Sequence, residues 1–338
     1  MKSRRVLVLM HEDLIPPKSL DGLHQLEVFD IKTEYDVCQG LEELGHEIRE
    51  VGIKNDLGPL DRAIEEFQPD IVFNLLEEFR GNVLYDYAVV SYLELKHVPY
   101  TGCNPRGLVL ARDKALAKKV LAYHRIGLPR FAVFPIDLRV KRPKNLGFPL
   151  IVKSLIAEGS TGIAQRSIVE NDEQLEERVR LIHERIRTDA IAEEFVEGRE
   201  LYVGVIGNHR LEVLPTWELF VDKLPPGAPR IATAKVKWDP GYQEKYDIRI
   251  DRAKDLGDKL EKEIGQVSRR IYRRLGLSGY ARIDFRLSDE GKLYFLEANP
   301  NPDIADTEEL ASAAEAAGIQ YHDLLQKLVS LGLRRALP

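Results

Sequence analysis

The stretch from Tyr280 to Asp303 reads YARIDFRLSDEGKLYFLEANPNPD, and it decides which fold we expect. Two runs of alternating apolar and polar residues, Ala281–Leu287 and Leu293–Ala298, flank the turn signal Ser288-Asp289-Glu290-Gly291. Alternation of this kind on both sides of a short turn predicts a β-hairpin.

The polar face of this hairpin carries a candidate metal site. Successive side chains of a strand point to opposite faces, so Arg282, Asp284 and Arg286 share one face. Folding back at the turn brings Asp284 close in register to Glu297 and Asn299. Two carboxylates and an amide oxygen suit Mg²⁺, which takes such ligands together with phosphate oxygens. Spacing alone also fits a surface hairpin with solvated charges.

Length and composition indicate a globular protein of two or three α/β domains. The chain has 338 residues, of which 44% are hydrophobic and 31% charged. Its net charge of −6 is too mild to indicate a nucleic-acid or membrane surface, and no apolar run approaches a membrane span. The cysteines, Cys38 and Cys103, show no disulfide or metal spacing, so we expect a reducing, cytoplasmic location.

The first hundred residues alternate between predicted strands and helices. The expected strands are Val6–Met10, His46–Ile53, Ile71–Leu76 and Val98–Thr101, and the expected helices are Thr33–Leu44, Pro59–Phe67 and Val83–Leu95. This order predicts a doubly wound parallel sheet with helices on both faces. Ligands of such sheets bind beyond the carboxyl ends of the strands. No G-x-G-x-x-G follows the first strand, which disfavours dinucleotide binding.

The middle of the chain contains a candidate phosphate-binding loop. A basic helix is predicted over Arg106–Ile126, and most of its lysines fit a solvated face. The buried strand Gly147–Lys153 then leads to Glu158–Ile163, which reads EGSTGI. Backbone N–H groups of such a loop can surround phosphate oxygens, and Lys153 adds a positive charge. The loop lacks the G-K-[ST] ending of a Walker A motif, and alone it also fits an ordinary connection.

The segments before the hairpin supply further candidates. Strands over Ile191–Val196 and Glu200–Ile206 meet at a glycine, and the carboxylates of Glu193 and Glu200 suit a purine and a ribose, or are ordinary edge-strand acids. We expect Ala234–Tyr246 to form a loop over the site. Long helices are predicted at the end of the chain, over Arg252–Leu275 and within Glu308–Leu331.

Six motifs follow one another in the order typical of the ATP-grasp superfamily. They are Lys114, Lys153, EGSTGI (158–163), EEFVEGRE (193–200), GYARIDFR (279–286) and LEANPNP (296–302). From about Val72 to Leu331 the chain resembles the D-alanine–D-alanine ligase branch, which VPYTGCNP (98–105) and the following Arg112-Asp113-Lys114 also fit. The resemblance implies an N-terminal α/β domain over residues 1–104, a central α+β lid subdomain over 105–190 and a C-terminal α+β subdomain over 191–338.

The resemblance also implies roles in nucleotide binding. Lys114 and Lys153 match lysines that contact the ATP phosphates. The flexible loop that covers the phosphates matches Gly159, Ser160, Thr161 and Gly162, with Ser160 or Thr161 near the reacting centre. The adenine and ribose site matches Glu193, Phe195, Val196 and Glu200, of which Glu193 meets the adenine amine and Glu200 the ribose hydroxyls.

The remaining implied roles concern catalysis. Asp284, Glu297 and Asn299 match the ligands of two Mg²⁺ ions, which Mn²⁺ can replace. Arg282 matches the arginine that steadies the acyl phosphate and the tetrahedral intermediate. The implied reaction activates a carboxylate with ATP and passes its acyl group to an amine, forming an amide. The branch further implies small-molecule carboxylate and amine substrates and a homodimer.

Three stretches depart from the substrate-binding motifs of the branch. After the first strand, His11 to Pro17 and a longer insertion to Asp30 replace a motif that holds a glutamate and a serine. After Asn74, the sequence LLEEFRGN lacks the histidine of the branch. Glu12 is therefore either a grip for a substrate amine or a solvated loop acid.

The third departure follows Asn299 and adds negative charge. Small residues and a serine–leucine pair of the branch are replaced by a stretch that includes the acids Asp303, Asp306, Glu308 and Glu309. These acids would repel a free carboxylate and attract a cationic or amine-rich acceptor. Their alternative role is to cap a helix N-terminus, where negative charge is favourable.

We therefore expect a carboxylate–amine ligase for amino-acid- or peptide-like substrates other than two D-alanines. The alternative within the class is a divergent D-alanine–D-alanine ligase. A non-catalytic ATP-binding regulatory protein is the alternative from another class, although a pure binder would not need the set Arg282, Asp284, Glu297 and Asn299. A kinase that stops at the phosphorylated carboxylate is a further option.

Overall fold

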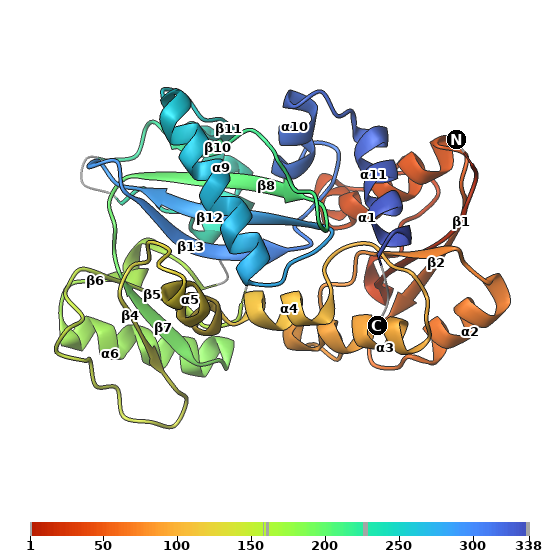
Figure 1. Ribbon diagram of the computed structural model, residues 1–338. Helices are drawn as coiled ribbons and strands as arrows, with labels where there is room; N and C mark the ends of the chain where they lie inside the picture. Colours follow the sequence, from red (N-terminus) through yellow and green to blue (C-terminus); the bar gives the residue numbers. More distant parts are fainter. Residues whose placement is uncertain (1, 158, 160–161, 226–228, 336–338) are drawn as a thin grey trace.

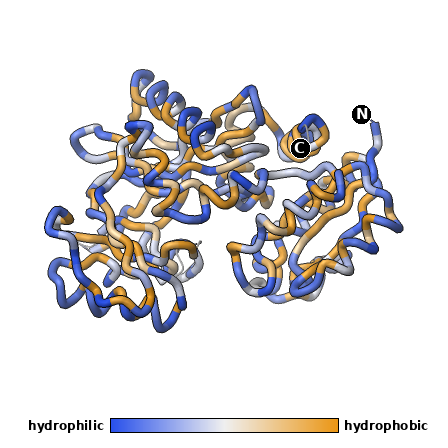
Figure 2. The backbone as a smooth tube through the Cα atoms, turned by 60° about the horizontal axis from the view of Figure 1, so that its bottom comes forward, coloured by the Kyte–Doolittle hydropathy of each residue, from blue (hydrophilic) through white to orange (hydrophobic). Residues whose placement is uncertain are grey.

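Three β-sheets organise the computed structural model, which describes residues 2–157, 159, 162–225 and 229–335. Figure 1 shows these sheets with helices packed against them, and the N-terminal sheet lies beside the C-terminal helices. Figure 2 shows hydrophobic residues concentrated along the strands and the inner sides of helices. No helix in the described ranges is both long enough and apolar enough to cross a membrane.

The N-terminal sheet is parallel and has the order β2-β1-β3. Its strands are β1 (Arg5–His11), β2 (Glu47–Ile53) and β3 (Ile71–Asn74). Alternate residues of β1 enter two different cores, because Leu7 packs with α2 (Gly58–Phe67) and α3 (Asp86–Leu95), and Val8 packs with α1 (Gln25–Glu43) and α11 (Tyr321–Leu333). The predicted parallel sheet with helices on both faces is confirmed.

The central sheet is antiparallel and has the order β4-β7-β5-β6. Its strands are β4 (Phe131–Phe134), β7 (Ala190–Glu194), β5 (Leu150–Ser154) and β6 (Ile168–Val169). Helix α6 (Asp172–Leu181) continues into a π-helical turn, Ile182–Ile186, and packs on one face of the sheet. Ala115 of α5 (Lys114–Tyr123) packs on Leu155 and Ile191 at the other side.

The C-terminal sheet holds the hairpin. It runs β11-β10-β8-β12-β13, and β9 (Glu212–Val213) also pairs with β8. The other strands are β8 (Arg199–Ile206), β10 (Trp217–Val221), β11 (Ile248–Arg252), β12 (Tyr280–Leu287) and β13 (Leu293–Pro300). Helix α9 (Gly257–Arg274) places Ile264 and Ile271 against the apolar side chains of β8 and β12.

Several predicted elements differ in extent from the observed ones. The helix predicted over Arg106–Ile126 is two helices, α4 (Pro105–Arg112) and α5, because Asp113 is extended and its side chain accepts a hydrogen bond from Leu116 N at 2.9 Å. Helix α1 starts eight residues earlier than predicted, at Gln25. The strand predicted over Val98–Thr101 is only a single bridge between Tyr100 and Val72.

The segment before α9 was also predicted incorrectly. The loop expected over Ala234–Tyr246 is formed by two short helices, α7 (Ala234–Trp238) and α8 (Pro240–Tyr246). Thr233 and Asp239 cap these helices with their side chains. The strand β11 follows, so the helix predicted from Arg252 begins only at Gly257.

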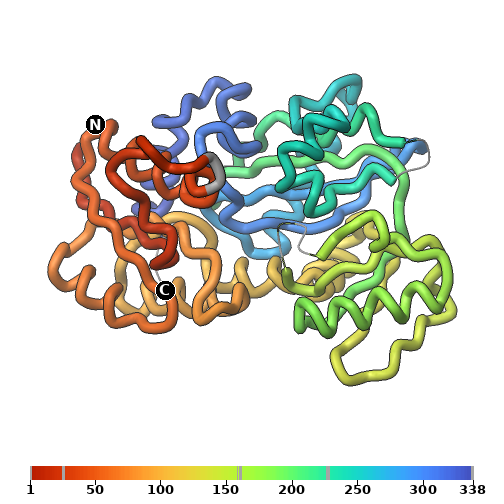
Figure 3. Tube along the Cα trace, turned by 180° about the vertical axis from the view of Figure 1, so that it is seen from behind, coloured from red at the N-terminus to blue at the C-terminus, as the bar shows by residue number. Residues whose placement is uncertain are grey.

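The two ends of the chain pack together. Figure 3 shows the N-terminal segment beside the C-terminal helices, of which α11 follows α10 (Glu309–Ala316). Val37 and Leu41 of α1 share a core with Leu325 and Val329 of α11. A β-carbon at Gly40 would lie 2.6 Å from Leu325 Cδ1, so the glycine allows the close approach of these helices.

The two cysteines are free and buried, and they lie in different cores. Cys38 belongs to the α1–α11 core, and Cys103 belongs to the core that also includes the α9 face of the C-terminal sheet. Burial raises the pKa of the Cys38 thiol, and it raises the pKa of Cys103 to about 11.

Candidate functional site

The hairpin brings four predicted site residues onto neighbouring positions. In the β12–β13 ladder Asp284 is paired with Glu297, and Arg282 is paired with Asn299. Asn299 Nδ2 donates a hydrogen bond to Asp284 Oδ2 at 3.0 Å, which leaves its amide oxygen for another ligand. The predicted turn and register are therefore both observed.

Arg282 and Asp284 form a bidentate ion pair on the polar face of the hairpin. Arg282 Nε and Nη2 donate to the two carboxylate oxygens at 2.8 and 3.1 Å. Burial raises the pKa of Asp284, and the Arg282 guanidinium opposes that shift. Arg282 Nη1 also lies 3.4 Å from Glu309 Oε2, so this arginine meets two carboxylates.

Glu297 lies among cations. Its Oε2 is 3.5 Å from the Nζ of Lys114, which also donates to the carbonyl of Ala157 at 2.7 Å. Burial would raise the pKa of Glu297, but Lys114, Lys153 and other nearby cations lower it to about 2. The carboxylate is thus ionised at neutral pH, as a metal ligand must be.

Asp284, Glu297 and Asn299 together fit a hard metal ion only in part. Two carboxylates and one amide oxygen leave most of an octahedral shell unfilled, as is usual for Mg²⁺ that also binds phosphate oxygens. Within the part of the chain that the structure describes, no group of three or more His, Cys, Asp or Glu side chains is arranged to hold a metal. A metal here would therefore depend on a second ligand such as a nucleotide.

A cavity lies between the central sheet and the hairpin, and we call it the inter-sheet cavity. Predicted nucleotide-binding and metal-binding residues line it, namely Lys153, Glu193, Phe195, Val196, Glu200, Asp284 and Glu297. Ile151, Ile231 and Leu296 add apolar surface. Apolar walls with a few polar groups are typical of a site for a small organic ligand such as a nucleobase.

Glu193 is the most unusual group of this cavity. It is fully buried, and its Oε2 lies 3.3 Å from Lys153 Nζ and 3.4 Å from Lys118 Nζ. Among the described residues, neither of its oxygens has a hydrogen-bond partner. Both lysines lie at Oε2, and because a buried acceptor without a donor is costly, the other oxygen, Oε1, fits a ligand N–H group such as the adenine amine.

Glu200 lies in the same cavity and is held by two neighbours. Arg286 Nη2 donates to its Oε2 at 2.8 Å, and the Tyr202 hydroxyl donates to its Oε1 at 3.1 Å. A carboxylate has about four acceptor positions, so Glu200 still has capacity for ribose hydroxyls. Arg286 shares the hairpin face with Arg282, as the alternation predicted, but sequence reasoning gave it no role.

A larger space, of about 500 Å³, adjoins the inter-sheet cavity, and we call it the central cavity. Arg282 and Asn299 line it from the hairpin, and Glu308 and Glu309 line it from the start of α10. Lys237 lines both cavities, which connects the lysines and Glu297 to the space around Arg282. This arrangement suits transfer of a phosphoryl group from one ligand to another beside a fixed cation.

Comparisons with known proteins agree with this geometry. The family described as "D-ala D-ala ligase C-terminus" matches residues 120–330. A D-alanine–D-alanine ligase from Aquifex aeolicus is 31% identical over 301 residues, covering 89% of this chain and 94% of the relative. The chain belongs to the D-alanine–D-alanine ligase family.

Solved structures of this family share the fold. A D-alanine–D-alanine ligase from Bacillus anthracis complexed with ATP superposes with a TM-score of 0.75 at 22% identity, covering 98% of both chains. A D-Ala:D-Ser ligase from Enterococcus faecalis has a TM-score of 0.70 at 19% identity, covering 98% of this chain and 99% of its own. The ATP-grasp fold predicted from the motifs is confirmed, and the protein is an ATP-dependent ligase.

The loop that covers the phosphates in ATP-grasp ligases is described only in part. Glu158, Ser160 and Thr161 lie outside the described residues, so the predicted role of Ser160 stays a prediction. The Gly159 carbonyl accepts a hydrogen bond from Trp238 Nε1 at 2.7 Å. Arg178 Nη2 donates to the carbonyl of Gly162.

Trp238 joins three parts of this ligase. Besides its bond to Gly159, its ring meets the Phe29 ring edge-on with 5.9 Å between centroids. Phe29 belongs to α1, so Trp238 of α7 contacts both α1 and the segment at Gly159. Sequence reasoning left open which residue of Lys235–Tyr246 faces the site. In the structure the central cavity is lined by Val236, Lys237, Trp238 and Gln243 of this segment.

Lys118 is a buried neighbour of Glu193 that sequence reasoning missed. The prediction that most lysines of this segment are solvated is wrong for Lys118, which is fully buried and donates to the carbonyl of Leu296 at 2.8 Å. Burial lowers its pKa to about 8, against the opposing charge of Glu193. The signal available was its spacing, because Lys118 follows Lys114 by four residues and so shares its helix face.

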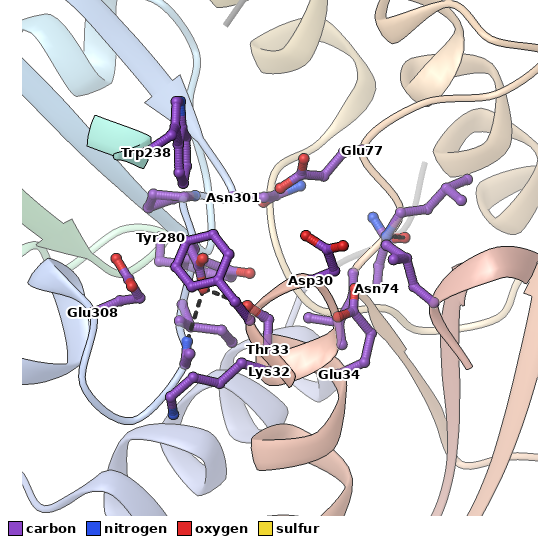
Figure 4. A pocket seen from close by; sticks show the side chains of 18 residues that line it. Asp30, Lys32, Thr33, Glu34, Asn74, Glu77, Trp238, Tyr280, Asn301 and Glu308 are labelled. Carbon is purple, nitrogen blue, oxygen red and sulfur yellow. Dashed lines mark hydrogen bonds between the residues drawn. The ribbon is translucent and has the colours of Figure 1, made fainter. Parts of the chain in front are cut away.

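A third cavity, of about 210 Å³, adjoins the central cavity, and we call it the acidic cavity (Figure 4). Acids from three segments line it, namely Asp30 and Glu34 of α1, Glu77 of the loop after β3, and Asp303 and Glu308 of the connection from β13 to α10. Asp303 Oδ1 accepts hydrogen bonds from Thr33 Oγ1 at 2.6 Å and from Ala305 N at 2.9 Å. Glu12, the other tentative substrate residue, is exposed, lies 3.7 Å from Lys54 and lines none of these three cavities.

Proposed function

We propose that this ligase joins a carboxylate to an amine through an acyl phosphate, and that its substrates are amino-acid-like but are not two D-alanines. The arrangement of the inter-sheet and central cavities supports the first step of this reaction, in which ATP activates the carboxylate. Lys153 and Glu297 stand on one side of Lys237, and Arg282 stands on the other. Nucleotide and acid would therefore meet near the hairpin.

The reaction requires activation because a carboxylate is a poor acyl donor, whose leaving group would be oxide. ATP with Mg²⁺ supplies the γ-phosphoryl group that converts it into an acyl phosphate, whose leaving group is inorganic phosphate. We expect Lys114 and Lys153 to neutralise charge on the phosphates. Arg282 is placed to hold the oxyanion that forms when the amine attacks. No covalent intermediate with the enzyme is needed.

Asp284, Glu297 and Asn299 would hold the metal, and Glu193 with Glu200 would hold the adenosine. Glu193 Oε1, which meets no donor among the described residues, supports that assignment. Trp238 and Gly159 would close the site against water, which would otherwise hydrolyse the acyl phosphate. Two metal ions, a homodimer, a cytoplasmic location and the domain boundaries after residues 104 and 190 stay predictions.

The observation that carries the substrate assignment is the acidic surface beside Arg282. Glu308 and Asp303 line the space that an acceptor would enter, and a free carboxylate there would be repelled. A divergent D-alanine–D-alanine ligase is the second candidate, and the 31% identity to the relative from Aquifex aeolicus favours it.

The test is phosphate release from ATP and Mg²⁺ across amino acids and short peptides, singly and in pairs, with mass spectrometry of every active mixture. We expect turnover only with an acid–amine pair whose product is lighter than the pair by one water. Turnover with D-alanine alone would establish the second candidate. ADP release with an acid but without any amine product would instead indicate a carboxylate kinase.

A further inference from the structure

We propose that the acidic cavity binds a second, cationic amino group of the amine substrate, so that the acceptor is a diamine or a basic amino acid. The inference rests on the proposed ligase function and names the class of its acceptor. It begins from charge. The described lining of the cavity has five carboxylates, from Asp30, Glu34, Glu77, Asp303 and Glu308, and a single basic residue, Lys32.

Lys32 does not balance these acids. Its ammonium forms an ion pair with Asp36, which lies outside the cavity lining. Figure 4 shows the Lys32 side chain turned away from Asp30 and Glu34. Acidic groups of the lining therefore outnumber its basic groups, and a bound cation would favour the ionised form of those whose pKa is raised.

Glu34 is the second, independent observation. It is only 5% exposed, it lines the cavity, and no other described residue forms a hydrogen bond or ion pair with its side chain. Burial and the nearby charges of Glu77 and Asp303 raise its pKa to about 8. Its own backbone N–H is the one hydrogen bond that opposes this shift, and a ligand ammonium would give this buried carboxyl group a charged donor.

Helix capping does not explain Glu308. This residue precedes α10, yet its side chain makes no capping hydrogen bond. Burial and the charges of Asp303 and Glu309 raise its pKa to about 7, although Arg282 opposes that shift. Glu308 faces both the acidic and the central cavity, so it is placed to meet a ligand that occupies both.

The position of the acidic cavity indicates that the cationic group belongs to the amine acceptor. The acidic cavity shares Trp238, Asp303 and Glu308 with the central cavity, and it shares no described residue with the inter-sheet cavity. It thus lies beyond the reacting centre as seen from the nucleotide side. An amine that attacks beside Arg282 would extend its other end there, and Trp238, Phe29 and Tyr280 add aromatic rings that favour a cation.

The size of the cavity fits a short chain. Its volume of about 210 Å³ is less than half that of the central cavity, about 500 Å³. A butylammonium group is of this order, and a macromolecular partner is not. We therefore expect probes such as 1,4-diaminobutane and ornithine to bind, and their analogues without the second amine to bind poorly.

The experiment measures calorimetric binding to the full chain with Mg²⁺ and a non-hydrolysable ATP analogue. We expect 1,4-diaminobutane and ornithine to bind at least about tenfold more tightly than butylamine and norvaline. Glu34→Gln and Glu308→Gln should each remove most of that advantage. Glu42→Gln, at an exposed position of the same helix α1, should keep it. Equal binding of diamines and monoamines, or an advantage unchanged in both cavity variants, would overturn the proposal.

Hydroxylamine capture separates this inference from the proposed function. Hydroxylamine replaces the acceptor, so hydroxamate formation from a panel of acids reports carboxylate activation without the acidic cavity. Hydroxamate without a diamine advantage would refute the cation site and leave the ligase. A diamine advantage without any hydroxamate would refute the ligase and keep the site. If Glu34→Gln no longer formed hydroxamate from ornithine, the acidic cavity would bind the cationic group of the acid substrate. The proposal that it binds the amine acceptor would then be wrong.

Discussion

Glu297 shows how individual charges prepare the site. Two opposing effects act on its pKa, namely burial, which raises it, and the surrounding cations, which lower it. The lysines outweigh burial, so its pKa lies at about 2, and the carboxylate stays ionised at any pH at which the protein would be assayed. A substitution of Glu297 therefore tests its role without interference from a change in its protonation state.

Replacing Glu297 with Gln should lower ADP formation by roughly 100-fold or more, because an amide is a weak metal ligand and does not neutralise Lys114. Circular dichroism should show an unchanged fold. Glu290→Gln is the matched control, since Glu290 is exposed at the turn of the same hairpin. Normal turnover of Glu297→Gln would remove this residue from the metal site.

Replacing Lys153 with Met should weaken ATP binding by about 10- to 100-fold, the value of one charge-assisted contact. Calorimetric titration with a non-hydrolysable analogue measures the effect. Lys119→Met provides the control, because Lys119 is exposed on α5. Unchanged affinity in Lys153→Met would mean that Lys153 does not meet the phosphates.

Glu34 should make the stability of the folded protein fall as the pH rises from 4.5 to about 8. Its folded pKa, about 8, lies above the ordinary 4.5, so the folded state loses stability as pH rises between these values. Glu34→Gln cannot ionise, and it should raise the melting temperature clearly at pH 8.5 and far less at pH 5. Thermal unfolding at the two values tests this, with Glu42→Gln as control. An equal shift at both values would show that Glu34 is not buried as a titrating acid.

The sequence allowed prediction of the residues that follow a period or a motif. Arg282, Asp284 and Glu297 could be placed because strand alternation decides their face. Lys118, by contrast, depends on the approach of α5 to β13, and Trp238 depends on contacts with Gly159 and Phe29. Such partners are brought together only by tertiary packing, which no local pattern encodes.

At the scale of elements, the errors occur where a local signal competes with a contact. Asp113 caps α5 and so divides a segment whose helix propensity is continuous. Helix α1 extends to Gln25, where a bond from His24 N to the Glu27 carboxylate at 2.8 Å supports its start. The strand β11 was missed because its residues alternate with charges, and its pairing with β10 decides its conformation.

The packing of α1 on α11 should be intolerant of bulk at Gly40. Gly40→Val would place its side chain against Leu325 and should lower the free energy of unfolding by about 1–3 kcal/mol. Urea denaturation measures this. The double variant Gly40→Val with Leu325→Ala should cost less than the sum of the single variants, because the clash is relieved. Strict additivity would contradict direct contact.

At the scale of the whole molecule, the motifs predicted the order of the three parts along the chain. They did not predict where the last helix packs. Residues of α11 lie in one core with Val8 of β1, although more than 300 positions separate them. The last helix therefore covers one face of the N-terminal sheet, and the boundary after residue 104 stays a prediction. Hydrophobic periodicity predicts that one face of such a helix is buried, but it does not predict which element that face packs against.

The two cysteines lie in separate hydrophobic cores, so the reactivity of each thiol can report when its own core opens. Cys38 lies in the α1–α11 core and Cys103 in the core that includes the α9 face of the C-terminal sheet, and both thiols are at most 2% exposed. A buried thiol with a raised pKa reacts only after its surroundings open. Pulsed alkylation in rising urea, followed by peptide mass spectrometry, should therefore show when each core opens. Rapid alkylation of both thiols without urea would contradict this burial, whereas two separate midpoints would mean that the chain unfolds in stages.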